Sequence, residues 1–401
     1  MSGRLGTRNG TGRSRAWCAV ALGLFDVLFD AFALNLALSS IGRDLGASTG
    51  DVRWVVSGYL LAVGCLMLPA GRAGDAYGHR RLLVLGLAGF GLASIACAVA
   101  PTLPALVVAR VLQGAGGASI APVGLALLTT AFPPERRGRV IGGAVGAGSV
   151  AMVAGPFLGG ALTQGLGWRA VFCVNAVLTV PALWCLRGVT APRRRARRHR
   201  DEGGPPLGLL RLGPYVTLTV AGGVANAATV ALLLLAPLAL QGERRLSPGV
   251  AGTVLVVPAV LMAVSGPIAG RIPARAAVGA MAGCLGTAAL ALLFLAVPTA
   301  LPAHLAALTA AAAALGTANA LTLTATQAIV PSDRAGSASG LTKSVVTLCG
   351  GLGAVVVDPG DDLGWSWVAL WCGVAAAALG AALAIPRVAL ALLSRGGAAN
   401  W

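Results

Sequence analysis

Residues 71–81, Gly-Arg-Ala-Gly-Asp-Ala-Tyr-Gly-His-Arg-Arg, form a short polar segment between two long apolar runs. The glycines permit a tight turn, Asp75 supplies an anion that can lie against a helix N-terminus, and Arg72 and Arg80 supply cations. The spacing Gly-x-x-x-Asp-x-x-Gly-x-Arg is far more specific than an ordinary basic turn. We expect a loop that latches the molecule in one conformational state. Its candidate residues are Gly71, Arg72, Asp75, Gly78 and Arg80.

The apolar runs on either side of this segment continue along nearly the whole chain. Of 401 residues, 57% are hydrophobic and 11% are charged, and the mean hydropathy is +0.82. A bilayer core about 30 Å thick needs roughly 20 apolar residues per helix. The runs show no period-two alternation, which excludes a β-barrel. The sequence therefore predicts an all-α membrane protein with helices near 16–38, 53–71, 82–100, 103–129, 140–163, 168–187, 213–241, 249–270, 276–297, 302–328, 335–357 and 364–391.

The formal net charge of +17 would suggest nucleic-acid binding in a soluble protein. Here the basic residues follow the positive-inside rule, by which Lys and Arg gather in cytoplasmic loops. With the N-terminus inside, 23 basic residues fall in cytoplasmic segments, five in outer loops and two within helices. We expect no nucleic-acid partner. We expect a multi-pass protein of a bacterial cytoplasmic membrane with both termini in the cytoplasm and a retained first helix.

Residues 191–206, Ala-Pro-Arg-Arg-Arg-Ala-Arg-Arg-His-Arg-Asp-Glu-Gly-Gly-Pro-Pro, divide the chain into two halves. The halves echo each other, since the segments around Pro101 and Pro134 recur around Pro298 and Pro331, both 197 residues later. Repeated six-helix halves indicate a transporter that can rock about a site at the midplane. The predicted parts are a cytoplasmic tail (1–15), a six-helix bundle (16–187), a cytoplasmic linker (188–212), a second six-helix bundle (213–392) and a cytoplasmic tail (393–401).

Four charged residues lie inside predicted helices, where each is expensive and therefore a functional candidate. Asp26 and Asp30 share one face of the first helix, and Arg110 lies in the fourth helix at a depth similar to that of Asp30. A carboxylate near a movable cation can couple proton binding to conformation; the alternative is a static ion pair that positions two helices. Asp26 could instead contact substrate. Lys343 is expected to snorkel to the cytoplasmic interface.

Closely spaced glycines in the fifth predicted helix allow a neighbouring helix to approach, and Pro156 can bend the helix. The eighth predicted helix, with Gly252 and Gly266, is a plausible partner. The residues of this candidate helix-packing motif are Gly142, Gly146, Gly155, Pro156 and Gly159.

The residues at 71–81 resemble the signature of the major facilitator superfamily. The segment Asp30–Leu38, with Asn35, is similar to a first-helix motif of its drug:proton antiporters. Residues 110–114, Arg-Val-Leu-Gln-Gly, are similar to the family's Arg-x-x-Gln-Gly motif, whose arginine is associated with proton coupling. Ser39 stands where the first-helix motif usually has proline. The resemblance implies the twelve-helix fold in two pseudo-symmetric bundles, with Asp30 and Arg110 as the proton-coupling pair.

The sequence and the resemblance together predict a proton-coupled antiporter that exports small amphipathic, lipophilic or cationic compounds. A dedicated exporter of one natural product, or a non-transporting sensor on the same fold, are the alternatives. Candidate residues of the substrate cavity are Asp26, Asn35, Gln113, Asn226 and Asn319. The eight cysteines show no metal-ligand spacing, and we see no nucleophile–base pair or phosphate loop. We expect no enzymatic activity, no metal and no cofactor besides the proton gradient, with substrate, protons and lipid as partners of a monomer.

Overall fold

The computed structural model describes residues 3–187, 189, 213–330, 335–357 and 364–384. Every regular element in these ranges is an α-helix, which confirms the predicted all-α class. The helices are α1 (Gly3–Leu45), α2 (Thr49–Tyr77), α3 (His79–Ala98), α4 (Leu103–Ala131), α5 (Pro134–Gly165), α6 (Arg169–Leu186), α7 (Gly213–Gly242), α8 (Pro248–Val254), α9 (Val256–Ala269), α10 (Ala274–Leu295), α11 (Leu301–Ile329), α12 (Ala335–Val356) and α13 (Gly364–Ala384).

Eleven spans among the described helices are long and apolar enough to cross a membrane, and α13 carries a shorter apolar stretch, Gly364–Gly380. This agrees with the prediction of about twelve membrane helices. One of the eleven, Pro248–Gly266, covers α8 and most of α9. The sequence predicts a single helix over 249–270, and the structure interrupts it at Leu255. Pro258 explains the break, because it has no N–H for the carbonyl of Val254 and its ring crowds that carbonyl.

The first helix is longer than predicted at both ends. It begins at Gly3, within the predicted tail, and continues to Leu45 rather than ending near residue 38. No proline occurs between these residues, and Ser39 leaves the helix free to continue at the position where a proline would interrupt it. Gly46, whose φ angle is +62°, then ends the helix in a conformation that glycine adopts without strain.

The chain divides into two compact units. The first comprises Met1–Ser48, Trp54–His199 and Arg245–Thr253, and the second comprises Thr49–Arg53, Arg200–Arg244 and Val254–Trp401. Residues 245–253, which include all of α8 except Val254, thus group with α1 to α6. The predicted domain boundaries stay a prediction.

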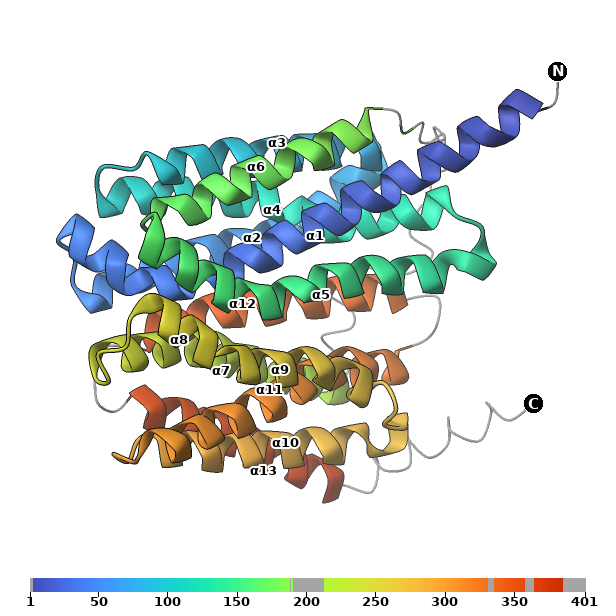
Figure 1. Cartoon of the computed structure of the whole chain (residues 1–401). Helices are drawn as coiled ribbons and strands as arrows, with labels where there is room; N and C mark the ends of the chain where they lie inside the picture. The colour runs from blue at the N-terminus through green and yellow to red at the C-terminus, as the bar shows by residue number, and fades with distance from the viewer. Residues whose placement is uncertain (1–2, 188, 190–212, 331–334, 358–363, 385–401) are drawn as a thin grey trace. The chain divides into compact units, whose positions relative to one another are not determined.

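In the first unit, α1 packs against α5, α6 and α4, while α3 packs against α4 and α6. Figure 1 shows α1 as the long blue helix beside α5, with its N-terminal end projecting past the neighbouring helices of its unit. An apolar core that includes Leu87, Phe90, Ile120 and Val123 fills the space between α1, α3 and α4. Because lipid is as apolar as these side chains, close van der Waals packing stabilises this core.

In the second unit, α7 packs against α12, α11 and α13, and α10 packs against α11 and α13. The Tyr215 hydroxyl ties α7 to α12 through the Ala338 carbonyl at 3.1 Å and the Thr342 hydroxyl at 2.9 Å. These two helices also approach closely, since a Cβ added at Gly353 would lie 2.7 Å from the Cβ of Ala227.

The contact between α1 and α5 depends on two glycines. A Cβ at Gly159 would lie 2.5 Å from the Cα of Ala33, and one at Gly155 would lie 2.6 Å from the Cβ of Phe32. By contrast, a Cβ at Gly142 would meet nothing within 4 Å. The same helix therefore contains a glycine that the packing requires and a glycine that it does not.

We expect Gly159→Ala to destabilise the protein by about 1–3 kcal/mol, because the backbone of α1 must move to admit the methyl group. Gly142→Ala is the matched control and should be neutral or slightly stabilising, since alanine favours a helix over glycine by about 1 kcal/mol. Thermal unfolding of the two purified variants in detergent measures the difference. Equal unfolding temperatures would contradict the packing described for α1 and α5.

Candidate functional site

A buried ion pair joins α1 to α4 inside the first unit. The Arg110 Nη1 atom lies 2.9 Å from Oδ1 and 2.7 Å from Oδ2 of Asp30. The side chain of Asp30 is fully buried and that of Arg110 is 1% exposed. The structure thus brings together the two residues that the sequence places at similar depths in different helices.

Groups from the helix interiors hold the Arg110 guanidinium on its other sides. Its Nε atom donates to the backbone carbonyl of Val55 on α2 at 3.0 Å, and Nη1 also donates to Oε1 of Gln113 at 2.5 Å. The ring of Tyr59 on α2 lies 4.2 Å from the guanidinium carbon, close enough for a cation–π interaction. Phe172 on α6 lies on the guanidinium too, at 5.8 Å.

The Asp30 carboxylate also accepts hydrogen bonds from two amides. Asn175 on α6 donates to Oδ1 at 2.6 Å, and Gln113 on α4 donates to the same atom at 3.4 Å. The Gln113 amide in turn donates to the Ser94 hydroxyl on α3 at 2.8 Å. Five helices of the first unit therefore meet at one polar cluster, whose members are Asp30, Tyr59, Ser94, Arg110, Gln113 and Asn175.

The sequence suggests Gln113 as a residue of the substrate cavity. In the structure its side chain is hydrogen-bonded to both members of the ion pair. The sequence analysis did not identify the other three members of the cluster, which are Tyr59, Ser94 and Asn175. Uncharged polar residues are common in membrane helices, so their presence alone gives no signal. The one available signal was that Asn175 stands in α6 at a depth that matches Asp30, about one and a half turns from the helix start at Arg169.

The cluster can respond to a single proton. Taking a carboxylate and a guanidinium out of water costs several kcal/mol each, and their mutual attraction offsets this cost only while both are charged. A proton on Asp30 would remove that attraction and leave the buried Arg110 charge without its partner. The arrangement can therefore link protonation of one carboxylate to the packing of five helices.

The other two polar candidates on α1 lie on either side of Asp30. Asp26 is fully buried, and neither of its carboxylate oxygens has a hydrogen-bond partner. Asn35 is 4% exposed and donates to the Ala31 carbonyl of its own helix at 2.5 Å, while its Oδ1 atom has no partner. Neither side chain belongs to the ion-pair cluster by a hydrogen bond.

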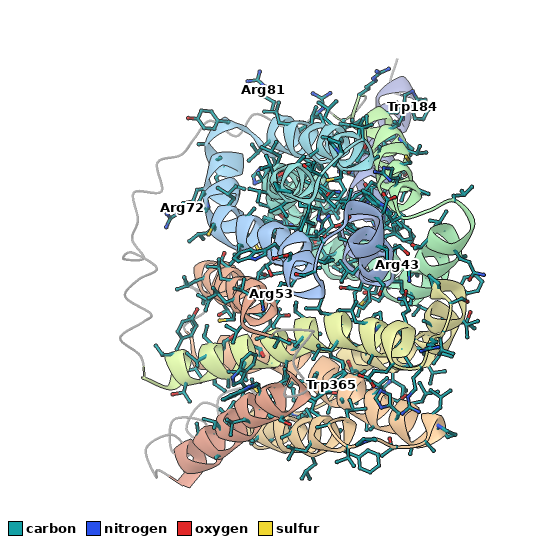
Figure 2. The ribbon with its side chains drawn as sticks, turned by 90° about the vertical axis from the view of Figure 1, so that its left-hand side faces the viewer. Arg43, Arg53, Arg72, Arg81, Trp184 and Trp365 are labelled. Carbon is teal, nitrogen blue, oxygen red and sulfur yellow. The ribbon has the colours of Figure 1, made fainter. Side chains whose placement is uncertain are left out.

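The loop candidates at 71–81 do not form one cluster among the described side chains. Asp75 pairs with His79 at 3.1 Å across the junction, and Arg80 donates to the Leu186 carbonyl at the end of α6 at 2.8 Å. Gly78 adopts a φ angle of +102° and forms the turn between α2 and α3. Figure 2 shows Arg72 and Arg81 pointing outward from their helices. The role of these residues as a latch stays a prediction.

Some glycines of α5 lie against α1 or α8, and others face open space. Gly155 and Gly159 face α1, whereas a Cβ at Gly142 or Gly146 meets nothing within 4 Å. Gly160 and the Pro156 carbonyl lie against Pro248 and Gly252 of α8, the helix that the sequence indicates as a partner. The nearby Gln164 accepts hydrogen bonds from the Gly249 N–H at 2.9 Å and the Ser247 hydroxyl at 3.1 Å.

The two asparagines of the second unit bond to neighbouring helices. Asn226 on α7 donates to the Val346 carbonyl of α12 at 2.9 Å, and Asn319 on α11 donates to the Thr229 hydroxyl of α7 at 2.8 Å. These are the interhelical contacts that explain an asparagine in a membrane helix without any substrate. Lys343 on α12 is exposed.

Among the described residues, no group of three or more His, Cys, Asp or Glu side chains lies close enough to hold a metal ion.

Apolar helices that can span a bilayer, with a charged pair buried among five of them, define a polytopic membrane protein. The sequence model of the Major Facilitator Superfamily matches residues 20–354. The chain belongs to this superfamily.

Three relatives with known names are similar to part of this chain. The chain is 42% identical over 177 residues to a tetracenomycin C resistance and export protein of Streptomyces glaucescens, covering 43% of this chain and 32% of that protein. It is 43% identical over 186 residues to a puromycin resistance protein of Streptomyces alboniger (45% and 37%). It is 35% identical over 207 residues to a multidrug resistance protein of Mycobacterium tuberculosis (51% and 38%). The matches thus span about a third of each relative's length.

Solved structures agree in fold. The crystal structure of a D-xylose–proton symporter superposes with a TM-score of 0.72 at 13% identity, covering 92% of this chain and 96% of that one. A bacterial homologue of the human lysosomal transporter Spinster, in an inward-facing conformation, superposes with a TM-score of 0.68 at 16% identity and covers 96% and 97%. At these identities the likeness concerns the fold alone.

We expect Arg110→Met to destabilise the protein by about 3–5 kcal/mol, because it leaves Asp30 charged, buried and without its cation. Adding Asp30→Asn should recover a large part of this loss, since the double variant buries no unpaired charge. Thermal unfolding in detergent of the two single variants and the double variant gives the coupling between the residues. Additive effects would contradict an energetically coupled pair.

Proposed function

We propose that this chain is a proton-coupled antiporter that exports small amphipathic, lipophilic or cationic compounds by alternating access. The observation that carries the proposal is the Asp30–Arg110 ion pair, buried among five helices with every charge matched. Membership of the superfamily supports transport of a small molecule. The names of the relatives, which describe export and resistance proteins, support an outward direction.

In the proposed cycle, a proton that enters from outside binds Asp30 and removes its attraction for Arg110. The guanidinium keeps its bonds to the Val55 carbonyl and to Gln113, so it stays buried while the α1–α4 link weakens. The weakened link favours the conformation with lower affinity for substrate, and substrate leaves. Loss of the proton to the cytoplasm restores the pair. No cofactor enters this cycle, because the proton gradient supplies the free energy.

A dedicated exporter of one natural product is the second candidate. Two of the relatives are named for a single antibiotic each, tetracenomycin C and puromycin. The mechanism of coupling would be the same, and only the breadth of the substrate site would differ. The residues of that site, for which Asp26, Asn35, Gln113, Asn226 and Asn319 are the sequence candidates, stay a prediction, as does a monomeric state.

Energy-dependent uptake of the cationic dye ethidium into inverted membrane vesicles tests the proposal. We expect uptake by the native protein, abolished by an uncoupler and by Asp30→Asn, because an amide cannot bind and release the proton. Asp44→Asn is the matched control on the same helix. Asp44 is 47% exposed and pairs with Arg169 at the surface, where solvent screens the attraction, so uptake should persist.

The outcomes separate the two candidates. No uptake by a well-inserted native protein would reject multidrug export and favour the dedicated exporter. Uptake that survives Asp30→Asn would reject Asp30 as the coupling carboxylate.

The charge distribution supports placing both termini and the 188–212 linker in the cytoplasm of a bacterial cell. We expect alkaline phosphatase fused after Gly203 to be inactive, because this enzyme needs the oxidising periplasm for its disulfides. The same enzyme fused after Gly167, between α5 and α6, should be active. Activities in the opposite order would invert the proposed topology.

A further inference from the structure

Asp26 lies one helical turn from Asp30, about 6 Å along α1, on the side away from the cation. Its side chain is fully buried, and neither carboxylate oxygen has a hydrogen-bond partner. Moving an unpaired carboxylate from water into a protein interior is so costly that the group binds a proton instead. Arg110 already neutralises Asp30, so it leaves no charge for a second carboxylate.

The packing of α1 on α4 shows which residue of α4 lies at the level of Asp26. Asp30 meets Gln113 of α4, and seven residues earlier Gly23 faces Ile120, whose Cγ2 would lie 2.9 Å from an added Cβ. Seven residues on one helix thus match seven on the other. Asp26, four residues from Asp30, lies at the level of Gly117, which is four residues from Gln113.

A second polar group occupies this same level. A Cβ added at Gly117 would lie 3.2 Å from the Tyr59 hydroxyl, so that hydroxyl fills the space that the glycine leaves. Tyr59 is 3% exposed, and its hydroxyl has no hydrogen-bond partner. A buried acid and a buried hydroxyl, neither of them hydrogen-bonded, therefore lie at the level of Gly117.

No described cation on the helices packed against α1 lies near Asp26. On α1 itself the neighbour is Asp30, and α4 presents Arg110, which is paired. The charged residues of α5 lie in its first two turns and that of α6 in its first turn, far along the helices from Asp26. On α3, α5 and α6, the described titratable groups are His79, Arg80, Arg81, Cys97, Glu135, Arg136, Arg137, Arg139, Arg169, Cys173 and Cys185. None of these is a cation at the level of Asp26.

We propose that Asp26, with the Tyr59 hydroxyl beside it, is a second proton-binding site that is occupied while Asp30 is ionised and paired with Arg110. This gives Asp26 a role other than the substrate contact that the sequence suggests. It rests on the proposed proton antiport. In each cycle Asp26 binds a proton from outside while the site is open to that side, and it releases this proton to the cytoplasm once the site is open to the cytoplasm and water reaches it. The transporter then moves two protons per substrate, one on each carboxylate.

Infrared spectroscopy of the reconstituted protein tests proton binding without any substrate. At neutral pH, the native protein should show the carbonyl stretch of a protonated, buried carboxylic acid. The band should persist in the surface control Asp44→Asn and be lost in Asp26→Asn. Tyr59→Phe, which retains the acid, should shift the band because the hydroxyl is removed from its surroundings. A missing band, or a band unchanged by Asp26→Asn, would overturn the second site; no shift in Tyr59→Phe would remove Tyr59 from it.

Proteoliposomes loaded with ethidium then test whether the proton is carried. Exchange of two protons for one monovalent cation moves net charge, so the native protein should respond to an imposed membrane potential. Asp26→Asn should keep exchange driven by a pH gradient but lose the response to potential, as the ratio falls from two protons to one. If the infrared band is present but Asp26→Asn leaves the ratio of protons to ethidium unchanged, Asp26 is a permanently protonated structural acid. That result would overturn the proposal that Asp26 carries a second proton. If the native protein moves no ethidium, the proposed multidrug function fails, while the infrared result still decides whether Asp26 binds a proton.

Discussion

The attraction between one buried carboxylate and one buried guanidinium controls the arrangement of the first unit. In a low-dielectric interior, neither Asp30 nor Arg110 is tolerated unless the other is present and the remaining hydrogen-bonding atoms are satisfied. The Val55 carbonyl and the amides of Gln113 and Asn175 provide those partners. Because these groups come from α1, α2, α4 and α6, the rotation and depth of each helix are constrained by the pair.

The pair can form only because the backbones come close. The backbones of α1 and α5 approach closely at Gly155 and Gly159, and those of α3 and α4 approach about as closely, since a Cβ at Gly116 would lie 2.6 Å from the Phe90 nitrogen. Between membrane helices there is no hydrophobic drive to associate, so close van der Waals packing carries much of the stability. Small residues on α4 and α5 thus fix the distance at which Arg110 reaches Asp30.

The sequence contained most of the fold and half of the site. Apolar run length predicts the spanning helices, and the cost of a buried charge identifies Asp30 and Arg110. The partners Asn175, Ser94 and Tyr59 could not be predicted, because which faces of two helices meet depends on rotations that an apolar run does not specify. The break at Leu255 was readable from Pro258, whereas the extension of α1 past residue 38 followed from Ser39, a residue that lacks any signal of its own.

The buried cluster is more informative as a charge balance than as a set of contacts. Two carboxylates and one guanidinium can be neutral only with one proton present, so the state in which Asp30 is bound to Arg110 is also a state in which Asp26 is protonated. If a second proton reaches Asp30, the cluster becomes positive, and the unmatched guanidinium then favours any conformation that admits water or an anion. Opening the bundle is such a conformation. The same balance that stabilises the closed first unit therefore makes its opening sensitive to a single added proton.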